Sequence, residues 1–148
     1  MDIGTLPPGS LLGVSPWQMI DQDMINRFAD LTMDHQFIHV DPVRAAASPL
    51  GGTVAHGFLT LSLASHLIAQ AVPGLQDGIT GSLNYGLDRL RFLTPVRAGS
   101  RVRGRFTLRG TEPRGDGARL LRVAVEIEID GADRPAMAAD WLIMQMLD

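Results

Sequence analysis

Apolar and polar residues alternate along the second half of the chain. In RVRGRFTLR (residues 101–109) and LLRVAVEIEI (residues 120–129), apolar residues alternate with charged or small ones. This period of two is typical of strands with one buried face and one solvated face. TEPRGDGA (residues 111–118) and DGADRP (residues 130–135) predict hairpin turns. MAADWLIMQML (residues 137–147) is more uniformly apolar, which favours a central strand or a subunit-contact strand.

The first half of the chain shows helical signals instead. After a first strand or extended lead-in at residues 9–20, Asp21 is placed to cap a helix. Asp41 followed by Pro42 predicts a second helix start, because proline favours the first helical position. The longest helical candidate, residues 53–72, is apolar on nearly all sides. Such a helix is expected to be buried by structure that wraps around it.

Helices followed by a run of antiparallel strands predict an α+β fold. The 148 residues, 45% hydrophobic and 20% charged, are typical of a soluble globular protein. No internal repeat or linker divides the sequence, so residues 1–148 are expected to form a single domain.

The charge distribution is uneven although the formal net charge is only -3. A slightly acidic chain disfavours nucleic-acid binding. The sequence has no lysine, and ten of its 13 basic residues are arginines between Arg89 and Arg122. A positive sheet surface there would suit a phosphorylated ligand, whereas a solvated outer face of the strands explains the pattern at least as well.

The sequence predicts a cytoplasmic protein. It has no cysteine, which is compatible with a reducing compartment. The N-terminal MDIGTLPPGS lacks the pattern of a signal peptide, and no apolar run approaches membrane-spanning length.

Asp34 and His39 stand out because neither a helix nor a strand aligns side chains five residues apart. An acid and a histidine in a loop are usually solvated. Here Phe37 and Ile38 lie between them and can anchor the segment to the core, so that the polar side chains face a cavity. With AHG at the head of the apolar helix as a second motif, the segment predicts a functional site.

Together these motifs resemble the MaoC-like dehydratase family, which includes the (R)-specific enoyl-CoA hydratases, and most closely its NodN-like branch. The resemblance rests on DHQFIHVDPVRAA (residues 34–46), GGTVAHGFLTLSL (residues 51–63) and NYGLDRLRFLTPVRAGSRV (residues 84–102), and it spans nearly the whole chain. Gln36 and Phe37 replace the usual Asn-Pro. This departure changes how the loop is braced but leaves the acid and the histidine in place.

The resemblance implies a hot dog fold, in which an antiparallel sheet wraps around a long central helix near residues 56–72, and a homodimer. It implies that Asp34 and His39 form a catalytic dyad that adds water to a trans-2-enoyl-CoA thioester. Asp34 would take a proton from the water, while His39 orients the water and transfers the proton to the α-carbon. Syn addition would give the (R)-3-hydroxyacyl thioester, and no cofactor is implied.

Gly57 is the expected donor to the thioester carbonyl oxygen. A backbone N–H near a helix start is free and is supported by the helix dipole, and glycine allows a ligand to approach closely. The resemblance assigns the carbonyl to the Gly57 amide, and Ser65 matches a family serine that supports the dyad. His56 is interpreted as a structural residue, and His66 as part of a polar helix face or subunit contact.

Alternative chemistries make weaker use of these residues. A metal site built from His35, His39 and His56 is rejected because the chain has no zincin-type carboxylate and no cysteine. A hot dog thioesterase would also use an acid and a helix-terminal amide, but without the opening Asp-x4-His segment. A catalytically silent acyl-thioester-binding protein would not need both Asp34 and His39.

Overall fold

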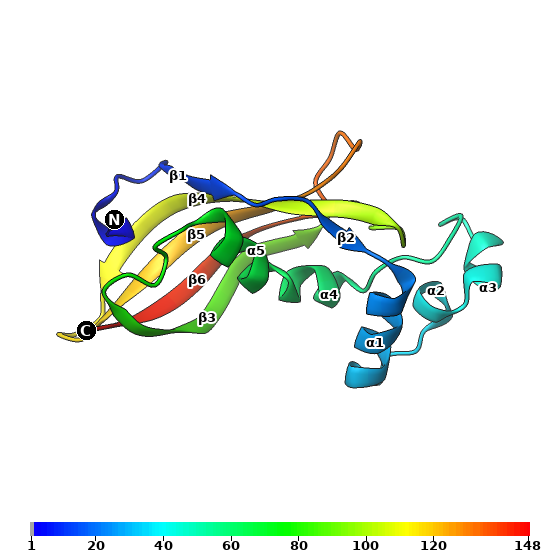
Figure 1. The fold of residues 1–148 in the computed structure, drawn as a ribbon, viewed down its shortest axis with the longest axis horizontal. Helices are drawn as coiled ribbons and strands as arrows, with labels where there is room; N and C mark the ends of the chain where they lie inside the picture. Colours follow the sequence, from blue (N-terminus) through cyan, green and yellow to red (C-terminus); the bar gives the residue numbers. More distant parts are fainter. Residues whose placement is uncertain (1) are drawn as a thin grey trace.

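Antiparallel strands form the second half of the structure, as the alternating pattern predicts. The computed structural model describes residues 2–148. Its strands are β1 (Leu11–Val14), β2 (Gln18–Ile20), β3 (Ile79–Phe92), β4 (Ser100–Pro113), β5 (Ala118–Ile129) and β6 (Met137–Leu147). They form one sheet in the order β1-β4-β5-β6-β3, with β2 also paired to β4 (Figure 1). The uniformly apolar β6 lies between β5 and β3, which confirms the prediction of an internal strand.

The helices precede the long strands. They are the 3₁₀ turn η1 (Ile3–Thr5), α1 (Gln22–Thr32), α2 (Phe37–Val40), α3 (Pro42–Ala46), α4 (Gly57–Ser62) and α5 (Ala64–Ala71). Both predicted caps are confirmed, since Asp21 accepts from the Met24 N–H and Asp41 from the Arg44 N–H. Figure 1 shows α5 against the sheet and α1 to α3 gathered at one end. Within the described residues, no helix has the length and apolar character needed to span a bilayer.

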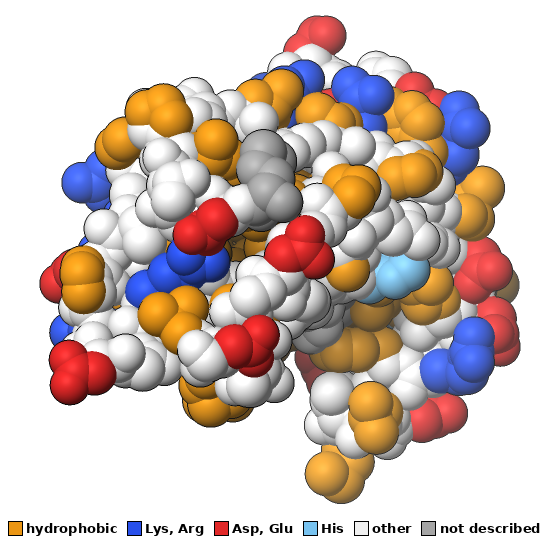
Figure 2. All heavy atoms as spheres, turned by 60° about the vertical axis from the view of Figure 1, so that its left-hand side comes forward, with side chains coloured by type: hydrophobic (Ala, Val, Ile, Leu, Met, Phe, Trp, Pro, Cys, Tyr) orange, Lys and Arg blue, Asp and Glu red, His pale blue; other side chains and the backbone are white. Residues whose placement is uncertain are grey.

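Most arginines between Arg89 and Arg122 are paired with carboxylates. Seven of the ten form ion pairs: Arg101 with Asp130, Arg103 and Arg105 with Glu128, Arg109 with Asp140, Arg114 with Glu112, Arg119 with Asp2, and Arg122 with Asp88. On the face shown in Figure 2, acidic and basic side chains are interspersed. This pairing favours the solvated outer face over a phosphate site.

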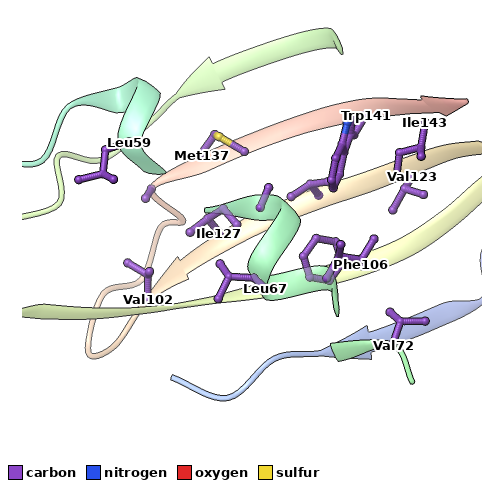
Figure 3. Packing of buried hydrophobic residues seen from close by; sticks show 14 of the residues in the cluster. Leu59, Leu67, Val72, Val102, Phe106, Val123, Ile127, Met137, Trp141 and Ile143 are labelled. Carbon is purple, nitrogen blue, oxygen red and sulfur yellow. The ribbon is translucent and has the colours of Figure 1, made fainter. Parts of the chain in front are cut away.

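The hydrophobic core lies between α5 and the inner face of the sheet. Leu67 of α5 is fully buried, as are Val102 and Phe106 of β4 and Ile127 of β5 (Figure 3). Burying such a side chain stabilises the fold by roughly 1.5–3 kcal/mol. The apolar helix is therefore held against the sheet, as the sequence predicts.

The predicted helix over residues 53–72 is shorter than expected and is interrupted. Helical structure begins only at Gly57, and Leu63 separates α4 from α5. Leu63 keeps helical dihedral angles (φ -70°, ψ -16°), so the interruption is slight. The Ser62 hydroxyl donates to the Phe58 carbonyl oxygen at 2.7 Å, a contact that competes with helical hydrogen bonds and often bends helices.

Gly13 allows β1 to pack against the end of α5. A Cβ atom at this position would lie 2.0 Å from the Ala71 carbonyl oxygen, which belongs to the backbone and cannot rotate away. The approach of strand to helix therefore requires glycine.

The close contact at Gly13 predicts a large difference between two glycine substitutions. Gly13→Ala is expected to lower the free energy of unfolding by about 1–3 kcal/mol because β1 or α5 must shift. Gly110→Ala in β4 is the control, since its added Cβ would have no neighbour within 4 Å. We expect the control to change stability by less than about 0.5 kcal/mol in urea unfolding. Equal stability of the two variants would contradict the packing requirement.

Candidate active site

The segment that carries Asp34 begins at a left-handed turn. Met33 ends α1 with a φ of 61°, in a region that favours glycine. The Ala29 carbonyl oxygen accepts from the N–H groups of both Met33 and Asp34. The turn closes α1 and leads the chain directly into the site.

Val54 joins the two sequence motifs through its backbone. Its N–H donates to the Ile38 carbonyl oxygen at 2.9 Å, and its carbonyl oxygen lies 2.6 Å from His39 Nδ1. Gln22 supports the same segment, since its side-chain amide donates to the His39 carbonyl oxygen at 2.7 Å and its oxygen accepts from the Thr53 hydroxyl. The sequence gives no signal for this role of Gln22, because an amide in a first helical turn is ordinarily a surface residue.

The rings of His39 and His56 are stacked in the interior. Their centroids are 3.8 Å apart, the ring planes differ by 21°, and both side chains are buried. His56 Nε2 lies 3.0 Å from the Asp34 carbonyl oxygen and 4.0 Å from its carboxylate Oδ2. The Phe28 ring lies 4.9 Å from the His56 ring. His56, which the sequence suggested as a structural residue, therefore lies in direct contact with both Asp34 and His39.

Backbone carbonyls define the protonation of both imidazoles. A carbonyl oxygen only accepts, so His39 carries a proton on Nδ1 and His56 carries one on Nε2. Burial lowers the pKa of His39 below its ordinary 6.5, and the neighbouring His56 acts in the same direction. The Val54 hydrogen bond and the Asp34 carboxylate oppose this shift without cancelling it. Neutral His39 therefore keeps a lone pair on Nε2.

Asp34 lies at the open side of the histidine pair. Its side chain is 54% exposed, and its Oδ1 accepts from the Gln36 N–H at 3.3 Å. One Asp34 carboxylate oxygen and one ring nitrogen each of His39 and His56 lie within 4.8 Å of one another. A water molecule with two hydrogen bonds of ordinary length joins atoms about 4.6 Å apart, so the spacing suits a shared water.

The same three side chains could be considered as metal ligands. However, the His39 and His56 rings are stacked face to face with their planes 21° apart, and each ring already has one nitrogen in contact with a backbone carbonyl oxygen, Nδ1 in His39 and Nε2 in His56. His35 is directed elsewhere, since its Nε2 lies 2.8 Å from Asp30 Oδ1. The donor set therefore fits a metal ion poorly.

A pocket of about 270 Å³ opens beside His39 and Gly57. Most of its wall is apolar and includes Ile38, Leu50, Val54, Phe92 and Val96. Gly57 is the first residue of α4, and its N–H has no acceptor among the described residues. A Cβ at Gly57 would lie 3.1 Å from the Phe92 ring, so glycine keeps this wall open.

Ser65 lies outside this pocket. It is exposed on α5 and lines two other hollows beside Asn84 and Trp141. Within the chain, the structure brings together Asp34, His39 and His56, and places Gly57 in the wall of the His39 pocket. The supporting role of Ser65 stays a prediction. His66 is also exposed on α5, on a polar part of the helix.

Two relatives cover most of this chain. Nodulation protein N of Rhizobium leguminosarum bv. viciae is 50% identical over 141 residues, or 95% of this chain and 87% of that protein. The 3-hydroxyacyl-thioester dehydratase Z of Mycobacterium tuberculosis is 44% identical over 135 residues, or 91% of this chain and 88% of that protein.

Comparison with solved structures confirms the fold. The (R)-hydratase from A. caviae, described as involved in PHA biosynthesis, has a TM-score of 0.74 and 24% identity, covering 94% of this chain and 96% of that chain. The sheet and its packed helix are those of the hot dog fold. The family described as MaoC like domain matches residues 5–128. The chain therefore belongs to the MaoC-like dehydratase family.

Proposed function

We propose that this protein hydrates trans-2-enoyl-CoA thioesters to (R)-3-hydroxyacyl-CoA thioesters, and catalyses the reverse dehydration. The observation that carries the proposal is the spacing of Asp34 and His39, whose polar atoms are close enough to share one water. The pocket beside His39 and Gly57 supplies a place for the substrate. The dehydratase relative supports the same reaction class.

The proposed addition uses one water and regenerates both side chains. Asp34 removes a proton from the water. At the same time the water oxygen bonds to the β-carbon, and the electrons of the double bond shift to form an enolate. Nε2 of neutral His39 accepts a hydrogen bond that orients the water, then takes the removed proton from Asp34 and delivers it to the α-carbon, which leaves both groups as they began. Attack and protonation from one side give syn addition. Because the two groups are coupled, each proton step belongs to the pair.

The developing enolate oxygen needs a donor. The Gly57 N–H has no acceptor within residues 2–148, and Gly57 borders the same pocket as His39. A donor aimed at a developing oxyanion stabilises the transition state, and removing one costs about 3–4 kcal/mol in other enzymes. The apolar wall at Ile38, Leu50 and Phe92 is the proposed contact for the acyl chain.

Substitution of the dyad tests the proposal. Asp34→Asn and His39→Gln are each expected to lower kcat by about 10²–10⁴-fold because they remove proton transfer. The assay follows the loss of enoyl-thioester absorbance with crotonyl-CoA and a longer enoyl-CoA. His35→Gln is the control, since His35 contacts Asp30 instead.

A thiol reagent in parallel assays distinguishes the alternatives. Free CoA released by the wild type would identify a thioesterase. Ligand retention without either signal would identify a silent binding protein. A dyad variant that kept most of its turnover would remove that residue from the mechanism.

The lowered pKa of His39 predicts the acid side of the pH profile. His39 is neutral at pH 7, so kcat/KM should be maintained down to about pH 6.5 and should fall below it as Nε2 gains a proton. The measurement is kcat/KM between about pH 5 and about pH 8, with protein stability checked at each pH. An acid limb centred above pH 6.5 would contradict the assignment of His39.

The proposed functional unit is a homodimer joined at β3. This strand lies at the sheet edge and pairs with β6 on one side only. Leu83 and Tyr85 on β3 are each 58% exposed. An unpaired strand edge with exposed apolar side chains is a template for a second strand, so a second copy of the chain is the expected partner.

Charged substitutions on β3 test this dimer. The double variant Leu83→Arg with Tyr85→Arg is expected to lower the mass in solution from a dimer to the 16.0 kDa of one chain. Size-exclusion chromatography with light scattering measures it. Val43→Arg on α3 is the control, because Val43 is an even more exposed apolar residue that lies outside the sheet. A wild type that is already monomeric would contradict the proposal.

A further inference from the structure

His56 occupies a position that the proposed reaction does not use. Only 3% of its surface is exposed, yet it contacts both members of the dyad. One ring face stacks on His39, and Nε2 reaches the Asp34 carbonyl oxygen. No other side chain among residues 2–148 is hydrogen-bonded to that carbonyl.

The two ring nitrogens of His56 differ in their hydrogen bonding. Nε2–H is satisfied by Asp34, whereas Nδ1 is buried and has no partner among the described residues. A buried polar atom without a partner is costly, and an apolar ring of similar size would avoid that cost. Apart from its bond to Asp34, the imidazole is therefore expected to stabilise the fold less than a phenyl ring at the same position.

The bond from His56 reaches the backbone of Asp34, and the carboxylate of the same residue lies 4.0 Å from His56 Nε2. The Asp34 side chain is more than half exposed, and among residues 2–148 its carboxylate accepts one hydrogen bond, from the Gln36 N–H at 3.3 Å. Fixing the carbonyl oxygen of the same residue restricts its backbone, and thereby the position of the carboxylate relative to His39. Small displacements of a catalytic group strongly reduce rates.

We propose that His56 is a positioning residue, whose Nε2–H holds Asp34 by its backbone so that the carboxylate and His39 can share one water. This inference rests on the proposed function for its catalytic consequence. The anchoring itself is a property of the fold and can be measured without substrate.

Two variants separate the donor from the ring. His56→Phe keeps an aromatic ring for stacking but removes the donor. His56→Gln loses the ring but can place an amide N–H near the position of Nε2. We expect His56→Phe to lower kcat about 10–100-fold with KM changed by less than about threefold, and His56→Gln to recover most of the loss. His66→Gln on the exposed face of α5 is the control and should match the wild type.

Hydrogen–deuterium exchange of residues 33–40 supplies the readout that is independent of activity. Exchange should be faster in His56→Phe and close to wild type in His56→Gln. If the wild type shows no hydratase activity, the proposed function fails while this measurement still tests the anchor. Unchanged exchange in His56→Phe would overturn the anchor, and faster exchange with unchanged kcat would overturn the positioning role.

A third variant covers the case in which His56→Phe does not fold. His56→Asn carries its amide near the position of Nδ1, too short to reach Asp34, so it should lose activity while His56→Gln retains it. Equal losses in the asparagine and glutamine variants would show that the ring matters instead of the donor, and would overturn the proposal.

Discussion

The two hydrogen bonds of the Val54 backbone hold the candidate site together. The Val54 N–H donates to the Ile38 carbonyl oxygen, and the Val54 carbonyl oxygen accepts from His39 Nδ1, so a loop from the helical half of the chain is fixed to the segment that leads into α4. The bond to the Val54 carbonyl oxygen defines the tautomer of His39 and, with the Gln22 and His56 contacts, fixes its position. Because both Val54 hydrogen bonds are buried, they gain strength from exclusion of water.

The pattern of the sequence predicts most of the fold because its signals are local. Alternation along β4 and β5 and the caps at Asp21 and Asp41 each depend on neighbouring residues, and all are confirmed. The division of the long helix at Leu63 is different. There the Ser62 hydroxyl bonds to the helix backbone, and one serine in a largely apolar helix gives no sequence signal for that contact.

The candidate site could be predicted only in part, because its geometry is tertiary. The motif resemblance gives Asp34, His39 and Gly57, and the structure places all three around one region. The stacking of His39 on His56 joins residues 17 positions apart and leaves no periodicity in the sequence. For the arginine-rich strands, the sequence pattern suggests more than the structure shows. The carboxylates that pair with these arginines lie on neighbouring strands, so the sequence alone overstates the positive charge of the surface.

The link at Val54 is made by backbone atoms, so the groups that hold the site together differ from the side chains that line the pocket. Peptide groups join the loop to the start of α4, whereas side chains such as Leu50 and Phe92 form the pocket wall. A peptide group is the same for every residue except proline, which lacks the N–H. Side chains of the pocket wall can therefore be exchanged without breaking the backbone links that hold the candidate site, so the shape of this pocket can be redesigned while its framework is kept.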